Sequence, residues 1–435
     1  MCRTNMGGKR GVLCHITSLP NLGISDAKKF ITLLSENGID AWQMLPINPP
    51  DVHGSPYAST SAFAGWKELV ESPNHGSMEH DSYWLEDWVL FRIIKSHYQG
   101  LPWTEWPVEV RDRHTDALDA WRGSLDFEVE LTAQKSFQAG WDELLRFANE
   151  KEVSLIGDLP IFVAHDSADV WAHRELFQLD ENGMPTVVAG VPPDYFSEEG
   201  QKWGTVLYNW EAHRKENWRW WRERFSRVLR LFDSVRIDHF RGFHSAWAIP
   251  AEDTNAKNGI WQDGPKDELI QVLIEVAKSE EVIIAEDLGI IPPEVIELRV
   301  RNGLRGMGVL QFGFDGDLKT NPNNPVNING QQVVYTGTHD NNTTLGWWND
   351  SDEGRRTRVK EFLGEGEDIV EGCIRLALEC KATMAIIPLQ DILGLDSGSR
   401  MNKPGTALDN WKWKFTWNDA LINKMHWFGH YLNPP

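Results

Sequence analysis

The feature of this sequence that most constrains its fold is a regular alternation of short apolar runs with helical patterns. Each run ends at or just before a polar residue, as strands of a parallel sheet do. Between the runs, apolar residues recur every three or four positions, the spacing of amphipathic helices. Eight strands alternating with helices predict an α/β protein, a (β/α)8 TIM barrel. The eight runs are at 11–15, 40–45, 154–158, 233–238, 282–286, 308–312, 332–336 and 384–389.

Two stretches do not follow this alternation and are expected to leave the barrel. Residues 54–132 are irregular and rich in Trp and Pro, which predicts an inserted subdomain with some short helices. Residues 165–211 lie between the third and fourth strands and are too long for an ordinary connection, which predicts a long active-site loop. No Pro-rich or Ser/Gly-rich linker divides residues 1–435, so we expect a single catalytic barrel with inserted subdomains around its C-terminal face.

The charge balance excludes several classes of partner. With 43 Lys+Arg against 64 Asp+Glu the net charge is −21, which repels phosphate backbones and anionic membrane surfaces. We therefore expect no nucleic-acid and no membrane partner. The sequence has no apolar stretch long enough for a signal peptide or a membrane span. The four cysteines lack C-x-x-C spacing, so we expect reduced thiols and a cytoplasmic protein.

The segment 233–243 (DSVRIDHFRGF) carries ionisable groups to the end of a predicted buried strand. By strand alternation, Val235 and Ile237 point to one side, and Arg236 and Asp238 to the other. A guanidinium two residues away favours the ionised form of Asp238, and a carboxylate nucleophile must be ionised. For an isolated R-x-D, a strand end that runs into a solvated loop remains the alternative.

Two further strands end in, or just before, a carboxylate: Glu286 in IIAEDLG and Asp340 in VVYTGTHDNNTT. Each alone could cap a helix or face water. Three acids on one barrel rim fit cleavage of a glycosidic bond with retention, in which one carboxylate attacks and another donates the proton. We therefore expect Asp238 to be the nucleophile, Glu286 the proton donor and Asp340 a stabiliser. Glu286 is expected to be protonated near neutral pH, with its pKa raised by Asp238.

Two histidines, His239 and His339, flank two of these acids. A zinc site needs His, Cys or Asp ligands at defined spacings, and the fourteen histidines show no such motif. We expect His339 to hydrogen-bond sugar hydroxyls, with a structural role as the alternative. The 22 tryptophans supply core packing, and for some of them stacking against sugar rings is the alternative.

Once these residues are placed, the chain resembles the 4-α-glucanotransferases of the amylomaltase or disproportionating-enzyme family. Such enzymes cut an α-1,4-glucan, form a covalent β-glucosyl-enzyme, and pass the glucan to the 4-hydroxyl of another sugar. The resemblance implies maltooligosaccharides and α-1,4-glucans as substrates, and no metal or organic cofactor. Its motifs occur in one order along nearly the whole chain: GVLCHITSLP, SPYASTSAFAG, YWLEDW, IGDLPIFVAHDSADVW, VVAGVPPDYFSEEGQKWG, LFDSVRIDHFRGF, IIAEDLG, VLQFGFDGD, VVYTGTHDN and RMNKPGT.

The resemblance also implies roles for individual residues. The three acids match the nucleophile, the acid/base and the transition-state stabiliser of the family. Four residues match contacts to the donor sugar or the nucleophile, with Tyr57 as an aromatic platform: Tyr57, Asp158, Arg236 and His339. Three residues match the acceptor loop or the RMNKPGT segment: Gln201, Trp203 and Asn402.

The sequence departs from the family pattern in four places. The bridge from 66 to 83 is short, so the subdomain at 54–132 is expected to be cut down, and the turn at 21–25 is also short. Thr205-Val206 stand where Asn-Pro is expected, and Asn342 stands where Asp is expected. These changes leave the acceptor preference and the glucan length open. The same three acids would also serve a retaining α-glucan hydrolase, and a catalytically silent glucan-binding protein is a further alternative. The sequence does not decide between a monomer and a homodimer.

Overall fold

The computed structural model describes residues 9–70, 78, 82–193, 197–289, 291–406 and 408–431. Eight parallel strands form its central sheet, in the order β10-β7-β3-β2-β1-β13-β12-β11. A parallel bridge between Ile284 and Arg305, and a hydrogen bond from the Ala285 amide to the Arg305 carbonyl (2.8 Å), bring the two edge strands together. The sheet therefore nearly closes, and the predicted (β/α)8 barrel is confirmed.

The barrel strands fall at the expected places, with small shifts of their ends. The sequence placed a strand at 308–312, but Leu310–Phe312 form a 3-10 turn because the Gly313 amide donates to the Leu310 carbonyl. The strands are β1 (Lys9–Leu13), β2 (Ala41–Gln43), β3 (Ser154–Pro160), β7 (Ser234–Asp238), β10 (Ile283–Ala285), β11 (Gly306–Val309), β12 (Gln332–Tyr335) and β13 (Met384–Pro388).

Strand alternation divides the apolar side chains into two cores. On β1, Val12 packs with the large core between sheet and helices, whereas Leu13 packs in a smaller cluster with Ile156, Val333 and Ile386 from other barrel strands. The smaller cluster fills the barrel interior, as in other barrels of this size.

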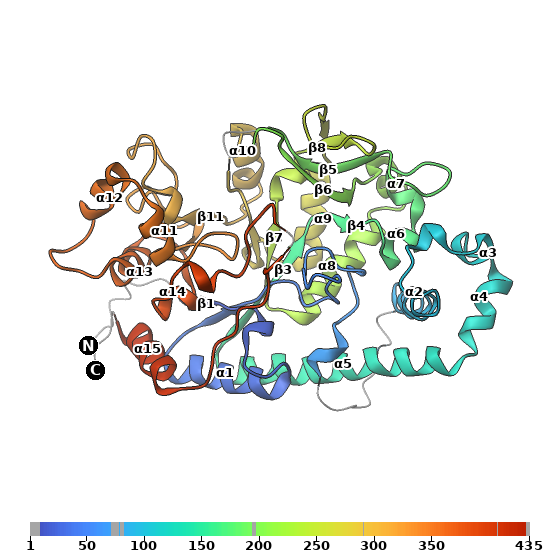
Figure 1. Ribbon diagram of the computed structural model, residues 1–435, viewed down its shortest axis with the longest axis horizontal. Coiled ribbons are helices and arrows are strands. Elements are labelled where there is room, and N and C mark those ends of the chain that lie inside the picture. The colour runs from blue at the N-terminus through green and yellow to red at the C-terminus, as the bar shows by residue number, and fades with distance from the viewer. Residues whose placement is uncertain are drawn as a thin grey trace.

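Helices surround the barrel, and α1, α5, α8 and α9 pack side by side in that order (Figure 1). The helices outside the insertion are α1 (Ile24–Glu36), α5 (Leu125–Glu150), α6 (Ala168–Ala172), α7 (Trp210–Lys215), α8 (Arg219–Leu231), α9 (Asp267–Ala277), α10 (Pro293–Arg301), α11 (Thr344–Asp350), α12 (Glu353–Lys360), α13 (Ile369–Glu379), α14 (Leu389–Ile392) and α15 (Asp419–His430).

The stretch at 54–132 contains α2 (Leu85–His97), α3 (Val108–Arg111) and α4 (Thr115–Arg122). These helices lie at one end of the molecule, around the first turns of α5 (Figure 1). Helix α5 begins at Leu125, inside this stretch, and the Ser124 hydroxyl caps it by accepting a hydrogen bond from the Phe127 amide. Part of the short bridge at 66–83 lies outside the described residues.

A second sheet, not predicted from the sequence, lies above the barrel rim (Figure 1). Its strands pair antiparallel in the order β4-β6-β5-β8-β9, and three of them come from the long stretch at 165–211 and its edges. Glycines and prolines interrupt the alternating strand pattern in this stretch. Strand β5 also pairs with β8, which comes much later in the sequence. The strands are β4 (Val163–Ala164), β5 (Val187–Val191), β6 (Gln201–Val206), β8 (Ser245–Pro250) and β9 (Ile260–Asp263). No helix among the described residues is long and apolar enough to cross a membrane.

Candidate active site

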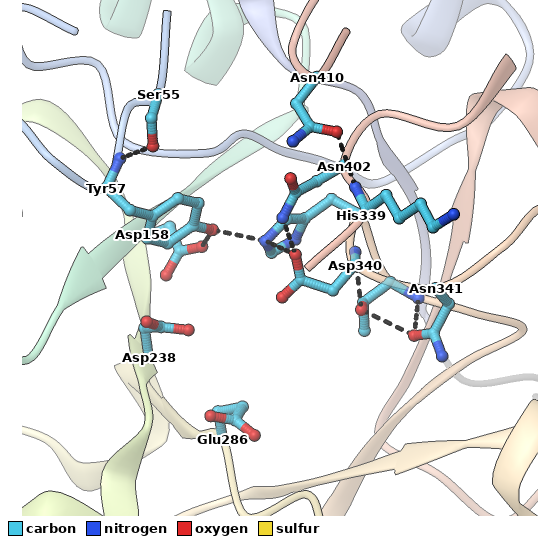
Figure 2. Close-up of polar contacts among 12 residues, drawn as sticks. Ser55, Tyr57, Asp158, Asp238, Glu286, His339, Asp340, Asn341, Asn402 and Asn410 are labelled. Carbon is cyan, nitrogen blue, oxygen red and sulfur yellow. Dashed lines mark hydrogen bonds and ion pairs between the residues drawn. The ribbon is translucent and has the colours of Figure 1, made fainter. Parts of the chain in front are cut away.

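Three carboxylates face one another at the C-terminal rim of the barrel (Figure 2). Asp238 is the last residue of β7, Glu286 follows β10 directly, and Asp340 lies in the loop after β12. Because neighbouring strands run parallel, their C-terminal ends meet at the same rim. Strand β7 pairs directly with β10, so the first two acids come from adjacent strand ends.

A buried ion-pair chain positions Asp238. Asp158 on β3 lies opposite Arg236 on β7, and Arg236 Nη1 donates to both Asp158 oxygens at 2.8 and 2.7 Å. Arg236 Nη2 pairs with Asp238 Oδ1 at 2.9 Å. Burial would lower the pKa of Arg236, but Asp158 and Asp238 raise it well above its ordinary value. The guanidinium therefore stays charged, and it holds Oδ1 of Asp238, whereas none of the described residues donates to Oδ2.

Tyr57 and His339 form a stacked pair above Asp158. Their ring centroids are 5.3 Å apart and nearly parallel. The Tyr57 hydroxyl donates to Asp158 Oδ2 at 2.6 Å and lies 2.9 Å from His339 Nε2. Since the only hydroxyl proton goes to Asp158, Nε2 must carry hydrogen and donate to the Tyr57 oxygen. Stacking and hydrogen bonding together fix the orientation of the imidazole.

Asp340 is held by the segment that carries the RMNKPGT motif. The Asn402 side-chain amide donates to Asp340 Oδ1 at 2.6 Å, and His339 Nε2 lies 3.4 Å from the same oxygen. The Arg400 guanidinium donates to the Asp340 main-chain carbonyl at 2.8 Å. The carboxylate is thus fixed on one oxygen, and its side chain remains 43% exposed toward the rim.

Glu286 lies in an environment that opposes its ionisation. Burial, followed by the Asp238 charge, raises the pKa of Glu286 to about 7, although Arg236 and two backbone amides act in the other direction. Those amides belong to His239, which donates to Oε2 at 2.6 Å, and to Leu288, which donates to Oε1 at 3.2 Å. The sequence attributed the raised pKa to Asp238, whereas burial is the larger cause.

Gln201 and Trp203 lie on β6, above the rim. The Trp203 indole N–H donates to Gln201 Oε1 at 3.2 Å, and 39% of the tryptophan is exposed. The indole also meets the His239 ring edge-on, with centroids 4.8 Å apart. The second sheet therefore places the Trp203 ring against His239, the residue that follows Asp238. All ten residues singled out from the sequence lie in this one connected region.

Two residues of the region were not found from the sequence. Trp411 packs near Tyr57 and His339, with centroids 5.8 and 6.1 Å away. Asp391 is 1% exposed, and it accepts hydrogen bonds from the hydroxyls of Thr336 and Thr344 and from the Thr344 amide, at 2.6 to 2.7 Å. Asp391 thus holds both ends of the loop that carries Asp340 in place. An acidic residue within an apolar run, three residues after β13 and in the short helix α14, was the only sequence signal for it.

The described residues of this site include no candidate set of metal ligands. Within the residues that the structure describes, no group of three or more His, Cys, Asp or Glu side chains is arranged to hold a metal ion.

A parallel barrel with a buried Arg-carboxylate pair, a carboxyl of raised pKa and an aromatic-lined rim is the arrangement of an enzyme that acts on glycosidic bonds. A sequence profile described as 4-alpha-glucanotransferase matches residues 14–75 and 74–419. The chain therefore belongs to the 4-alpha-glucanotransferase family.

Individual relatives agree with this assignment. The chain is 40% identical to a 4-alpha-glucanotransferase of Thermus thermophilus, over 93% of this chain and 94% of the relative. It is 37% identical to the chloroplastic/amyloplastic 4-alpha-glucanotransferase of Solanum tuberosum, over 95% and 83%. Among solved structures, amylomaltase from Streptococcus agalactiae in complex with acarbose superposes with a TM-score of 0.91 at 29% identity, covering 98% of this chain and 99% of that one.

Proposed function

We propose that the chain transfers segments of α-1,4-glucans by a retaining double displacement, with Asp238 as nucleophile, Glu286 as acid/base and Asp340 as stabiliser. The observation that carries the proposal is the contrast between two neighbouring carboxyls. Arg236 pairs with Asp238 at 2.9 Å, while burial and the Asp238 charge raise the pKa of Glu286 to about 7. A carboxylate held by a guanidinium, beside a carboxyl of raised pKa, fits a nucleophile and a proton donor.

In the first half-reaction, the free oxygen of Asp238 attacks the anomeric carbon of the donor glucose. The bond from that carbon to the glycosidic oxygen breaks, and the oxygen takes the proton of Glu286. The reducing-end fragment leaves, and a glucosyl ester remains on Asp238. Glu286 is then ionised, and Arg236 pairs with the oxygen of Asp238 that is not esterified.

In the second half-reaction, the 4-hydroxyl of an acceptor sugar gives its proton to the ionised Glu286. Its oxygen attacks the anomeric carbon and displaces Asp238, which restores the α-linkage and both carboxyls. Water attacking in the same way would give hydrolysis. Transfer therefore requires that the acceptor sugar displace water above Glu286.

The remaining residues fit the recognition of sugar rings on two sides of the acids. We assign the donor side to Tyr57, Asp158, Arg236 and His339, because these side chains form one hydrogen-bonded group beside Asp238. We assign the acceptor side to Gln201 and Trp203, on the exposed strand β6. Asn402 acts on Asp340 through the bond to its Oδ1. Maltooligosaccharides are the proposed substrates, in line with the acarbose complex of the Streptococcus agalactiae relative.

The proposal includes the organisation of the chain around this site. We treat residues 1–435 as one catalytic barrel, with 54–132 as an inserted and shortened subdomain and 165–211 as a long active-site excursion. A cytoplasmic location is supported by the free thiols of the three cysteines among the described residues, Cys14, Cys373 and Cys380. Burial raises the pKa of Cys14 and Cys373 far above their usual values, so neither is reactive.

The test is to incubate the purified protein with maltotriose alone and to chromatograph the products over time. Transfer yields glucose together with a ladder of longer maltooligosaccharides. Maltose and glucose without longer products would show a hydrolase, and unchanged maltotriose would show a silent binder.

The nucleophile is tested by Asp238→Asn, which removes the attacking charge. Turnover of maltotriose should fall by on the order of 10⁴ or more. A matched control is Asp263→Asn, at an aspartate whose side chain is 81% exposed, which should keep normal turnover. A loss of less than about tenfold in Asp238→Asn would contradict the assignment.

A further inference from the structure

His239, the residue that follows Asp238, has a left-handed backbone with φ 49° and ψ 51°. Residues with a Cβ avoid this region because that atom crowds the following carbonyl oxygen, and those that adopt it are often at functional sites. In this conformation the His239 amide points at Glu286 and donates to Oε2 at 2.6 Å. The φ and ψ of His239 set the direction of the chain that follows, so the turn that surrounds this hydrogen bond depends on the unusual conformation.

Neighbouring contacts hold this conformation in place. The Phe240 amide donates to the Glu286 carbonyl at 3.1 Å, and the Glu286 amide donates to the Ile237 carbonyl at 3.0 Å. The Gly242 amide donates back to the His239 carbonyl at 2.9 Å. A Cβ atom built on Gly242 would lie 2.7 Å from a side-chain carbon of Ile161, so the turn packs closely against its surroundings.

The His239 ring faces the other way, toward the second sheet. It meets the Trp203 indole edge-on, at 4.8 Å and 87°, and lies 6.3 Å from the Phe162 ring. Burial lowers the pKa of His239 to about 4, so the ring is neutral near pH 7. Asp238 and Arg241 are the charged groups that act on this ring. The contact with Trp203 is therefore one of packing between neutral rings.

We propose that His239 is a positioning residue that couples the acceptor-side Trp203 to the acid/base Glu286. The position of its ring depends on the Trp203 indole that it contacts. Its amide donates the hydrogen bond to the Glu286 carboxyl. An acceptor sugar stacked on Trp203 presses the indole against His239 and fixes that bond. This inference rests on the proposed roles of Trp203 and Glu286.

The coupling has a direction that suits the second half-reaction. An amide that donates to a carboxyl stabilises the ionised form. A bound acceptor that fixes the His239 amide therefore favours the Glu286 carboxylate, the form that takes the proton of the acceptor hydroxyl. The other charged groups acting on Glu286 are Arg236, which favours the carboxylate, and Asp238, which opposes it until it is esterified.

Two substitutions separate the functions of the backbone and the ring. His239→Gly keeps a residue that adopts the left-handed conformation freely but removes the contact with Trp203. His239→Val disfavours the conformation, because β-branched residues rarely adopt it, and so disturbs the turn that holds the His239 amide against Glu286. Lys278→Val is the matched control, since Lys278 is an exposed residue with φ 61° at the end of α9. The kinetics are measured with maltotriose as donor and glucose as acceptor, and thermal melting is recorded for each protein.

We expect His239→Gly to raise the KM for the glucose acceptor by about three- to tenfold with the pH profile of kcat/KM unchanged. His239→Val should move the basic limb of that profile upward by about 0.5 to 1 pH unit, because the ionised form of Glu286 loses a hydrogen bond. Lys278→Val should lower the melting temperature without either change.

The two kinetic results can each overturn the inference. An unchanged acceptor KM in His239→Gly would remove the link to Trp203, and that measurement stands even where the valine variant does not fold. An unmoved pH profile in a folded His239→Val would remove the link to Glu286, and both results leave the proposed reaction intact. Full turnover of a Glu286→Gln variant would instead remove the acid/base assignment, and this inference with it.

Discussion

At the residue scale, the site separates three acids by their surroundings. Asp238 has a fixed cationic partner, Glu286 is enclosed, and Asp340 is 43% exposed and held by an amide. These three environments fit the proposed roles of nucleophile, proton donor and stabiliser. Burial has a larger effect on Glu286 than any single neighbouring charge.

The raised pKa of Glu286 predicts the pH dependence of the reaction. The proton donor must be protonated in the free enzyme, and its pKa lies at about 7. We expect kcat/KM for maltotriose to fall as the pH rises through about 7, approaching about tenfold per pH unit at higher pH. The measurement is a pH series of initial rates, with stability checked at each pH.

Glu286→Gln, which cannot ionise, provides the comparison. It should lose this basic limb together with most of its activity. A Glu286→Gln variant that retained a wild-type basic limb would assign the limb to another group.

At the element scale, the antiparallel sheet decides how open the acceptor side is. Strand β6 is paired on both sides, with Val206 opposite Val163 of β4 and Val188 of β5. Val206 is fully buried, so this end of the strand is fixed, while Trp203 near the other end is 39% exposed. A proline at 206 would remove a strand amide and shorten β6. With Thr205 and Val206, β6 therefore continues past the position at which the Asn-Pro of the family pattern would end it.

A variant with the family dipeptide tests what this extension does. We expect wild-type protein to lose part of the glucosyl-enzyme to water, because the fixed strand leaves Trp203 accessible. Combined Thr205→Asn and Val206→Pro should lower the share of hydrolysis by about threefold, measured as new reducing ends against transfer products from maltotriose. Thr205→Asn alone keeps the strand amide at 206 and is the control. An equal ratio in the double variant and the wild type would refute the effect.

At the scale of the whole molecule, the N-terminal strand joins distant parts of the chain. Strand β1 pairs with β2 on one side and β13 on the other. Arg10 on this strand is 7% exposed, and its guanidinium donates to the carbonyls of Phe428 and Gly429 at the end of α15. Arg10 lies near the start of β1, away from the rim that carries the acids, where barrel residues serve stability.

Removing this guanidinium should destabilise the fold and leave catalysis intact. Arg10→Ala leaves buried helix-end carbonyls without a donor, so we expect the free energy of unfolding to fall by about 2 to 3 kcal/mol. Urea unfolding measures the loss, and kcat for maltotriose at low temperature should stay within about twofold of wild type. Lys9→Ala, at an exposed neighbour on the same strand, is the control. Equal stability of the two variants would contradict this function of Arg10.

The sequence by itself determined the elements and the chemistry that local pattern encodes. Apolar runs with period two and helical runs between them are local signals, and they were sufficient for the barrel and for carboxylates at its strand ends. The alternation around Arg236 placed that guanidinium and Asp238 on one side of a strand, where they pair at 2.9 Å. The ten site residues were named by these patterns together with the family resemblance.

Only the tertiary structure decided how distant segments meet. The Tyr57 and His339 rings stack although 282 positions separate them, and Trp411 joins them from near the C-terminus. Strand β5 pairs with β8, although the barrel strand β7 lies between them in the sequence. No local pattern therefore revealed the second sheet. The left-handed backbone of His239 is imposed by hydrogen bonds and packing around the turn rather than by the residue itself. Burial, which sets the pKa of Glu286, exists only once all of these segments have packed together.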